Sequence, residues 1–201
     1  KQKQRKIDKK NMNALIVGNR PLTRSIIQIS KDKMIIAADG GADKLLEYEI
    51  LPDKVIGDFD SISDKTATKL EDWLILNKDI QKTDLEKAVD YAIERGAKKI
   101  QIVGWSGGRI DHTLAALGLA FIPNVELIDD KFIVKVISDL EVISGEKGTL
   151  FSLIAMPEAR VSIDGARWEL NHEKLRMSGR GIHNEIGTSG KVSVQCHSGK
   201  L

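Results

Sequence analysis

The chain has few of the residues that build covalent or metal cross-links. It holds one cysteine, Cys196, in 201 residues, so it cannot form an intramolecular disulfide, and no Cys/His cluster has the spacing of a zinc site. Its apolar runs are all shorter than the roughly 20 residues that span a bilayer, and its first residues are polar and basic rather than signal-like. We therefore expect a cytoplasmic protein with no membrane contact and no structural zinc.

The chain also lacks a strong charge of one sign. Residues 1–11, KQKQRKIDKKN, hold six basic residues and one acidic residue, so the rest of the chain carries −3 although the whole carries +2. A general nucleic-acid binder would show a basic face and stacking aromatics on its folded domain. We expect no nucleic-acid partner, and a solvated, disordered tail over residues 1–11, with contact to a polyanion as the alternative.

Through its first two thirds, the chain alternates short apolar runs with longer amphipathic stretches. Strands are predicted at 13–18, 34–41, 53–61 and 98–104, and helices at 42–50, 63–74, 83–96 and 111–122. This alternation predicts an α/β fold, an open and mostly parallel sheet with helices on both faces, over residues 12–138.

From about Val125 the pattern changes to short alternating runs separated by turn residues. A hairpin is predicted over 127–136, and further strands at 149–156, 159–165, 167–170 and 191–196. Residues 139–201 therefore predict a small all-β domain, a sandwich or a partial barrel.

The segment IGDFDSI (56–62) places two carboxylates one residue apart directly after a predicted strand. In extended backbone, Asp58 and Asp60 share a face and Phe59 points the other way. Two neighbouring carboxylates repel each other unless a cation lies between them, and Mg²⁺ takes such hard oxygen ligands while sharing its other positions with water and phosphate. A polar surface turn is the alternative, because Gly, Asp and Ser are all turn residues.

The ends of the predicted strands decide between these two interpretations. They carry most acidic and glycine-rich motifs of this half: Gly18–Asn19, Asp39–Gly41, Asp58–Ser61 and Gly104–Asp111. The carboxyl ends of parallel strands meet at one edge of a sheet, which is where ligands bind in such folds. A scatter of surface turns has no reason to gather there, so the pattern favours a functional site.

The segment TDLEK (83–87) opens a predicted helix. Thr83 and Glu86 have the spacing of a capping box, which explains these two residues but does not require Asp84, although an acid in the first turn also favours the helix dipole. Lys87 lies one turn further on and can reach either solvent or a phosphate, and solvent is the commoner fate of a helical lysine.

The segment GWSGGRIDH (104–112) matches neither the ATPase phosphate loop nor the GxGxxG fingerprint. Its glycines would let backbone N–H groups approach an anion, and Arg109 adds a fork of donors suited to phosphate. His112 is at least as readily a capping or core-edge residue as a catalytic one. A Ser-His-Asp triad stays open, but no G-x-S-x-G elbow marks a nucleophile. Acids and an arginine without a marked nucleophile suit phosphoryl-type transfer to a substrate hydroxyl.

In this order and spacing, these segments resemble the thiamine pyrophosphokinase family. The resemblance is carried by AADGGAD (37–43), PDKVIGDFDSI (52–62), TDLEKA (83–88), GGRIDHTLA (107–115), GTLFSLIAM (148–156), VSIDGARWEL (161–170) and GIHNEI (181–186). It implies an α/β catalytic domain that binds ATP and Mg²⁺ over 12–138 and a thiamine-binding β-sandwich over 139–201. It also implies transfer of a pyrophosphoryl group from ATP to the thiamine hydroxyl, with release of AMP.

The resemblance further implies roles for particular residues. The metal site would be formed by Asp39, Asp58, Asp60 and Asp84. The catalytic set would be Asp58, Asp60, Asp84 and Arg109. The nucleotide would be bound by Asp39, Gly40, Lys87, Ser106, Gly107, Gly108, Arg109 and Asp111. The acceptor side would hold Gln81, Trp168, His183 and Asn184. In the family the vitamin lies at a homodimer interface, between the α/β domain of one subunit and the β domain of the other. A tryptophan in an alternating strand is more often part of the core, so the role of Trp168 rests on the resemblance.

The chain departs from the family pattern on the acceptor side. Where the family usually reads Asp-Gln-Asp-x-Thr-Asp, residues 79–84 read Asp-Ile-Gln-Lys-Thr-Asp; Ala116 replaces a common Asn, and His183 a common Ser. Two alternatives therefore stay open. One is the same reaction on another hydroxymethyl heterocycle, for example a pterin. The other is a non-catalytic nucleotide-binding or thiamine-binding module, against which the retained acidic set argues.

Overall fold

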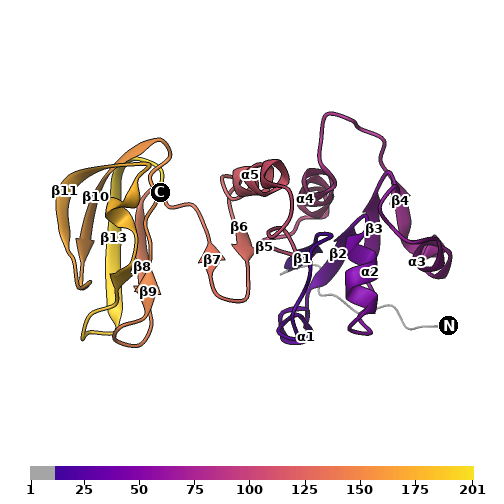
Figure 1. Ribbon diagram of the computed structural model, residues 1–201, viewed down its shortest axis with the longest axis horizontal. Coiled ribbons are helices and arrows are strands. Elements are labelled where there is room, and N and C mark those ends of the chain that lie inside the picture. The colour runs from indigo at the N-terminus through magenta and orange to yellow at the C-terminus, as the bar shows by residue number, and fades with distance from the viewer. Residues whose placement is uncertain (1–11) are drawn as a thin grey trace. The chain divides into compact units, whose positions relative to one another are not determined.

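The computed structural model describes residues 12–201, so the predicted basic tail of residues 1–11 lies outside the described residues. The chain divides into two compact units (Figure 1), the first ending at Lys135 and the second spanning Val136–Leu201. The first unit is built of alternating strands and helices, and the second is built mainly of strands.

The first unit contains one seven-stranded sheet in the order β4-β3-β2-β1-β5-β6-β7. Its strands are β1 (Ala14–Val17), β2 (Met34–Ala38), β3 (Lys54–Gly57), β4 (Leu74–Leu76), β5 (Ile100–Val103), β6 (Val125–Ile128) and β7 (Ile133–Val134). Strands β1 to β6 pair in parallel, whereas β7 runs antiparallel to β6 and closes a hairpin. The predicted open, mostly parallel sheet is confirmed.

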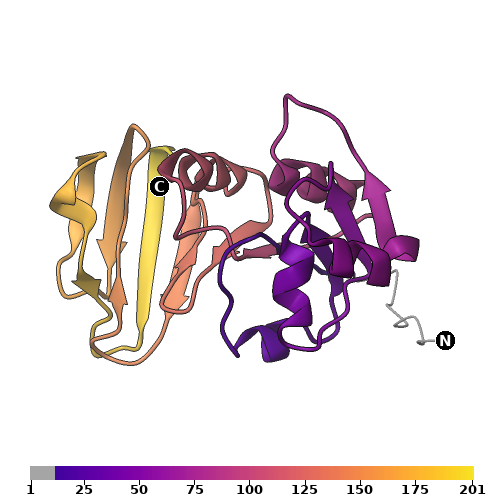
Figure 2. The same cartoon turned by 45° about the vertical axis from the view of Figure 1, so that its right-hand side comes forward.

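Helices cover both faces of this sheet, as Figure 1 and Figure 2 show. They are α1 (Ile26–Ile29), α2 (Gly41–Leu46), α3 (Asp64–Lys69), α4 (Asp84–Glu94) and α5 (Ile110–Leu119). Successive strand side chains point to opposite faces. Leu15 and Val17 therefore join one buried cluster with Leu45 of α2 and Leu70, while the other face of β1, β2 and β3 receives α4.

The predicted helix over 63–74 is wrong in its last third. The helix α3 ends at Lys69, a short 3₁₀ turn (Glu71–Trp73) follows, and the chain then forms the edge strand β4. Leu70 is completely buried and anchors the start of the 3₁₀ turn. Residues 74–76, which follow this turn, can therefore pair with β3. A three-residue strand carries too little periodicity to be distinguished from the last turn of a helix.

The predicted capping box of α4 is present. The Thr83 hydroxyl accepts a hydrogen bond from the Glu86 N–H, and a Glu86 carboxylate oxygen accepts one from the Thr83 N–H at 2.7 Å. This reciprocal cap fixes the first turn of the helix. It thereby positions Asp84 and Lys87 at the carboxyl edge of the sheet.

The second unit contains a four-stranded antiparallel sheet, β11-β10-β13-β8, and a two-stranded sheet, β12-β9. Its strands are β8 (Leu140–Ser144), β9 (Leu150–Phe151), β10 (Glu158–Asp164), β11 (Leu170–Arg176), β12 (Asn184–Glu185) and β13 (Lys191–Gly199). One core, which includes Val161, Leu175 and Val194, is buried between these strands. The β-rich second domain is therefore confirmed, although β8 and β12 were not predicted and the predicted strand at 167–170 reaches only Leu170 of β11.

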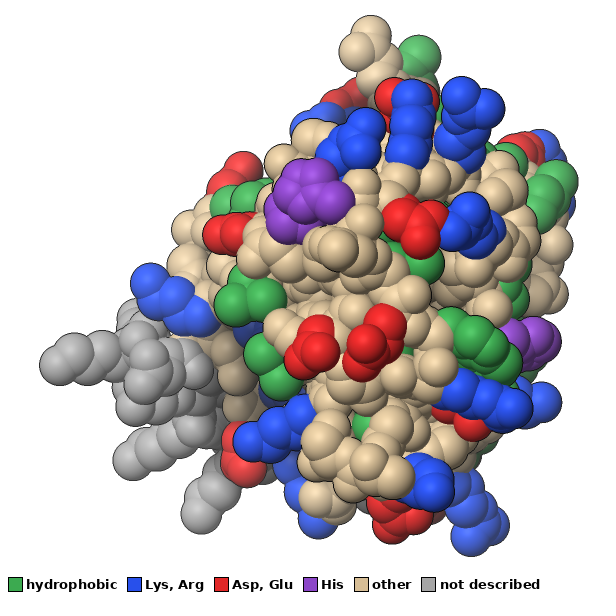
Figure 3. Space-filling model, turned by 90° about the vertical axis from the view of Figure 1, so that its left-hand side faces the viewer, with side chains coloured by type: hydrophobic (Ala, Val, Ile, Leu, Met, Phe, Trp, Pro, Cys, Tyr) green, Lys and Arg blue, Asp and Glu red, His purple; other side chains and the backbone are tan. Residues whose placement is uncertain are grey.

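The surface of the second unit is chemically mixed. On the face that Figure 3 shows, basic, acidic and apolar side chains are interspersed, and histidine side chains appear at two separate places. His172 and His197 stack with ring centroids 3.8 Å apart, and both lie beside Ser162 of β10. Interspersed charges of both signs give this face no strong field of one sign.

Candidate active site

The candidate site lies where the carboxyl ends of the central strands meet. β1 has β2 on one side and β5 on the other, so the strand order reverses here, and this is the position where open α/β sheets bind ligands. The loops after β1 and β5 touch: a Cβ on Gly18 would lie 2.5 Å from the Gly104 carbonyl oxygen. Only glycine allows this approach, and Gly104 also has a φ of 66°.

Three carboxylates gather at this edge. Asp39, Asp58 and Asp60 each offer an oxygen, and these oxygens all lie within 4.8 Å of one another. Asp39 follows β2, and the other two follow β3. Gly57 makes room for the group, because a Cβ there would lie 2.9 Å from the Asp39 Cβ. The structure thus brings three of the four predicted metal ligands together.

Asp39 is the buried member of this group, with an exposed fraction of 2%. One of its carboxylate oxygens, Oδ2, accepts a hydrogen bond from the Phe59 N–H at 3.0 Å, while Oδ1 is buried without a hydrogen-bond partner. Burial and the charges of Asp84 and Asp60 raise the pKa of Asp39 to about 6. A buried, unsatisfied carboxylate beside other carboxylates is costly unless a cation binds to it.

The donor set fits a hard divalent cation. Mg²⁺ prefers carboxylate oxygens and is usually held by one or two of them, together with water and phosphate oxygens. The orphaned oxygen of Asp39 supplies a ligand atom that nothing else in the described residues uses. Asp39, Asp58 and Asp60 would therefore hold the ion.

Asp84 lies in the same cavity but has a cationic partner. Its Oδ1 lies 2.9 Å from the Lys87 ammonium, which is only 4% exposed. Burial would lower the pKa of Lys87, but its hydrogen bond to Asp84 and the charges of Asp84, Asp58 and Asp79 outweigh this effect and raise it. Lys87 therefore stays charged and faces the cavity rather than solvent, while the role of Asp84 as a metal ligand stays a prediction.

These side chains line a cavity of about 400 Å³. The loop before α4 contributes Asp79, Ile80 and Lys82 to its wall, and α5 contributes His112 and Ala116. Gln81, which the resemblance placed on the acceptor side, is not among the lining residues. Ile80 is 97% exposed, so an apolar side chain stands at the rim where the family pattern has a polar one.

Arg20 is a site residue that was not predicted from the sequence. Arg20 lines the same cavity, and its guanidinium lies directly on Gly108: a Cβ at Gly108 would be 2.0 Å from the Arg20 Cζ. The rule that polar residues at strand ends form the site would have reached Arg20 if the segment after β1 had been extended by one residue.

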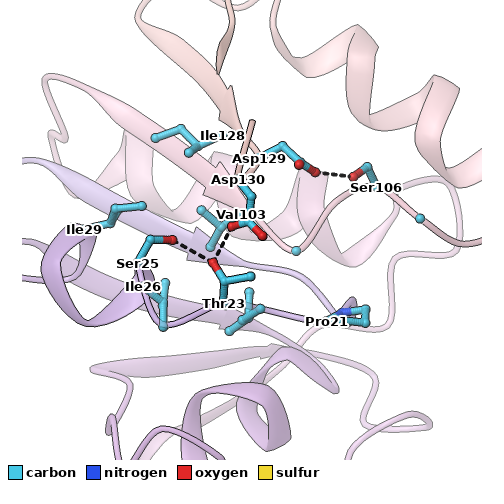
Figure 4. Close-up of a pocket in the computed structure, with 13 residues that line it drawn as sticks. Pro21, Thr23, Ser25, Ile26, Ile29, Val103, Ser106, Ile128, Asp129 and Asp130 are labelled. Atoms are coloured by element: carbon cyan, nitrogen blue, oxygen red, sulfur yellow. Dashed lines mark hydrogen bonds between the residues drawn. The ribbon is translucent and has the colours of Figure 1, made fainter. Parts of the chain in front are cut away.

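The predicted site residues of the glycine-rich segment after β5 do not lie together: two line a neighbouring cavity (Figure 4) and two lie exposed on the surface. Ser106 and Gly107 line a neighbouring cavity, where the Ser106 hydroxyl donates a hydrogen bond to Asp129 at 2.7 Å. Arg109 and Asp111 are exposed and form a two-point ion pair. The Arg109 Nε donates to Asp111 Oδ1 at 3.1 Å, and Nη2 donates to Oδ2 at 2.5 Å. The hydrogen bond from Arg109 lowers the pKa of Asp111 to about 2. Their binding of nucleotide phosphate stays a prediction.

In the second unit, Trp168 lies in the turn between β10 and β11, so the predicted strand at 167–170 is wrong at this residue. Its indole is 51% exposed, and the Arg167 guanidinium lies 4.5 Å from the ring centroid. A core role for Trp168 is therefore excluded, and one face of its ring carries a cation.

Asn184 holds this turn through the backbone of Trp168. The Asn184 Oδ1 accepts the Trp168 N–H at 3.1 Å and the Glu185 N–H at 2.9 Å, while its Nδ2 donates to the Trp168 carbonyl at 2.7 Å. Asn184 is 6% exposed, so its amide is occupied by the fold. The neighbouring His183 is exposed, and its N–H donates to the Ser152 hydroxyl.

Comparisons with known proteins agree with this architecture. The thiamin pyrophosphokinase catalytic domain matches residues 27–128, and the thiamin pyrophosphokinase vitamin B1 binding domain matches residues 137–201. The chain belongs to the thiamin pyrophosphokinase family. It is therefore an enzyme of this family, and the resemblance inferred from its motifs is confirmed.

Individual relatives extend the comparison. The chain is 36% identical over 90 residues to thiamine pyrophosphokinase from Bacillus subtilis (strain 168), a match that spans 43% of this chain and 42% of that protein. It is 23% identical over 221 residues to thiamine pyrophosphokinase 2 from Oryza sativa subsp. japonica, covering 90% of this chain and 82% of that protein. The crystal structure of the Bacillus subtilis enzyme shares the fold, with a TM-score of 0.82 at 23% identity, over 94% of this chain and 96% of that one.

Proposed function

We propose that this chain transfers a pyrophosphoryl group from ATP to the hydroxyl of thiamine with Mg²⁺, giving thiamine diphosphate and AMP. The thiamine oxygen bonds to the β-phosphorus of ATP while the bond from that phosphorus to the α–β bridging oxygen breaks. AMP leaves with the electron pair, and the hydroxyl proton is released. The buried, orphaned carboxylate of Asp39 in a three-carboxylate group is the observation that carries this proposal, and family membership supports both substrates.

The side chains around the cavity suit this chemistry. When bound, Mg²⁺ would neutralise charge on the phosphate oxygens. Lys87 holds Asp84 against the cavity wall and adds a buried positive charge, while Arg20 supplies guanidinium donors matched to phosphate oxygens. Phosphoryl-type transfer depends mainly on such positioning and charge stabilisation. The chain therefore needs no covalent nucleophile of its own.

The second unit supports binding of an aromatic acceptor. The exposed indole of Trp168 offers a face for ring stacking, and Asn184 fixes the turn that presents it. A homodimer that shares the acceptor site between subunits is part of the proposal. Leu140 and Val142, exposed apolar residues on the edge strand β8, support it.

A cytoplasmic location stays a prediction. Within residues 12–201, no helix is long and apolar enough to cross a membrane.

Product analysis tests the proposed reaction. The protein is incubated with ATP, Mg²⁺ and thiamine, and the products are separated by chromatography. Formation of AMP and thiamine diphosphate in equal amounts is the expected result. AMP formed only with a pterin alcohol or another heterocyclic alcohol would keep the reaction and overturn the acceptor, and no AMP with any acceptor would overturn the enzymatic proposal.

A further inference from the structure

Two of the chain's four histidines meet on the exposed face of the four-stranded sheet in the second unit. His172 belongs to β11 and His197 to β13, and both residues are exposed. These strands lie on either side of β10, so their backbones are roughly 10 Å apart, yet the ring centroids are only 3.8 Å apart. Both imidazoles therefore lean over β10 toward each other.

The backbone of both flanking strands is irregular at these histidines. On one side, β11 places Asn171 and His172 opposite Ser162 alone. On the other side, His197 is the extra residue where the register of β13 against β10 shifts. Such β-bulges re-aim side chains and are frequent beside functional sites. His172 also has a φ of 54°, a left-handed conformation that is uncommon outside glycine and is often found at ligand sites. The two bulges therefore direct both imidazoles to one place beside Ser162.

Ser162 of β10 is hydrogen-bonded to both histidines. Its hydroxyl oxygen accepts the His172 N–H at 3.0 Å and lies 2.8 Å from the His197 Nε2. Because this oxygen already accepts one hydrogen bond, its own proton is available to the Nε2 lone pair of a neutral imidazole. A metal ion binds to the same lone pair, so Ser162 orients a metal-ligating nitrogen of His197.

The donor atoms determine which kind of ion fits. Imidazole nitrogen suits Cu²⁺, Ni²⁺ and Zn²⁺, whereas Mg²⁺ and Ca²⁺ prefer oxygen ligands. The Arg160 guanidinium donates to the His172 carbonyl at 2.9 Å and places a positive charge beside the pair. Electrostatic attraction therefore does not favour a cation here, and binding has to depend on coordinate bonds to nitrogen. Among divalent first-row ions, Cu²⁺ binds most tightly to such donors.

We propose that His172 and His197 form a binding site for a divalent transition-metal ion, with Cu²⁺ bound most tightly. Each histidine supplies one imidazole nitrogen, so the bound ion links β11 to β13 across β10. The Ser162 hydroxyl and water are available for the remaining positions. This site lies in the second unit, differs in its donor atoms from the carboxylate group of the first unit, and does not depend on the proposed reaction.

Titration of the protein with Cu²⁺, followed by electron paramagnetic resonance, tests the proposal. Excess Mg²⁺ is present to compete for the carboxylate group. The wild type should bind Cu²⁺ with hyperfine splitting from two nitrogens. His172→Asn and His197→Asn should each bind it at least about tenfold more weakly and lose one nitrogen from the splitting, because the second contact is intramolecular and adds strongly to the first. Asparagine is chosen because it tolerates the left-handed backbone of residue 172.

His183→Asn is the matched control, since His183 is also exposed and also has a positive φ, 63°. It should keep the wild-type affinity and both nitrogens. Far-UV circular dichroism checks that each variant is folded, and His197→Asn decides the question alone if His172→Asn is not. Cu²⁺ affinity and nitrogen splitting that stay at the wild-type level in a folded His197→Asn would overturn the proposal, as would a wild type that shows no nitrogen splitting.

Discussion

Each of the two units buries a polar side chain, but the two side chains differ in how completely they are hydrogen-bonded. Asp39 in the first unit is 2% exposed and leaves one carboxylate oxygen without a partner, whereas Asn184 in the second is 6% exposed and makes three hydrogen bonds to backbone groups. An unsatisfied buried group costs stability and needs a reason, while a satisfied one stabilises a particular backbone conformation. We therefore expect Asp39 to bind a ligand directly, and Asn184 to hold the turn that carries Trp168 without binding a ligand itself.

The largest expected effect is on activity, at the exposed part of the carboxylate group. Asp58→Asn should lower kcat by about 100-fold or more, because it removes a metal ligand whose charge stabilisation is worth several kcal/mol. The free energy of unfolding should change by less than about 0.5 kcal/mol, since Asp58 is exposed. Steady-state kinetics and urea unfolding measure the two quantities.

The matched control for this variant is Asp64→Asn, at an exposed acid in the first turn of α3 that lies outside the cavity. It should keep wild-type activity. Equal activity of Asp58→Asn and Asp64→Asn would show that the carboxylate group has no catalytic part.

The next effect is on stability, in the second unit. Asn184→Ala removes three hydrogen bonds and leaves the Trp168 N–H and carbonyl without their partner, so unfolding should become easier by about 2 to 3 kcal/mol. Thermal unfolding followed by tryptophan fluorescence measures this. Asn171→Ala, at an exposed position of β11, should have little effect. A similar loss of stability in both variants would show that the hydrogen bonds from Asn184 to Trp168 do not stabilise the turn.

A pH-dependent effect of at most about 3 kcal/mol is expected at Asp39. Its folded pKa, about 6, lies above the ordinary value of 3.8, so the folded state binds the proton more tightly than the unfolded state. The stability that this group contributes is present below pH 3.8 and is lost as the pH rises through 6. Without metal, Asp39→Asn should therefore be more stable than the wild type at pH 8, with a smaller difference at pH 5.

Asp43 provides the control of opposite sign. Burial alone would raise its pKa, but hydrogen bonds from Ser63 and Thr66 outweigh this and lower it. Asp43→Asn should destabilise the protein at pH 8, and the loss should shrink as the pH falls toward 3. If both substitutions shifted stability in the same direction at pH 8, the contrast between an orphaned and a satisfied carboxylate would be wrong.

The smallest effect is expected beside Trp168. Arg167 contacts the indole and pairs with Glu185 at 2.8 Å, but both the guanidinium and the ring are more than half exposed. Arg167→Ala should change the free energy of unfolding by less than about 1 kcal/mol. A loss as large as that of Asn184→Ala would show that the cation, rather than the buried amide, holds the turn.

Local sequence patterns predicted what local physics controls. The alternation of short apolar runs with amphipathic stretches indicated the parallel sheet. Because ligands bind at the carboxyl ends of parallel strands, Asp39, Asp58 and Asp60 were predicted to lie together, although 21 positions separate the first from the last. The capping spacing at Thr83 and Glu86 was also sufficient, because the cap forms within one helical turn.

Tertiary contacts decided the rest. β4 is a strand because Leu70 is buried and β3 offers a free edge, neither of which is visible in three residues. Trp168 is exposed because Asn184, 16 positions away, holds its backbone in a turn. Ser106 lines a second cavity, where its hydroxyl donates a hydrogen bond to Asp129 of another loop. Periodicity carries no information on such distant pairings.

Binding of Mn²⁺, a spectroscopic substitute for Mg²⁺, tests most directly whether the orphaned carboxylate belongs to a metal site. Electron paramagnetic resonance titration of the nucleotide-free protein counts the bound ions in the wild type, Asp39→Asn and Asn184→Ala. The wild type and Asn184→Ala should bind the ion, and Asp39→Asn should bind it at least tenfold more weakly, because it loses the ligand oxygen that has no other partner. Equal Mn²⁺ affinity of the wild type and Asp39→Asn would show that the Asp39 carboxylate is not part of a metal site.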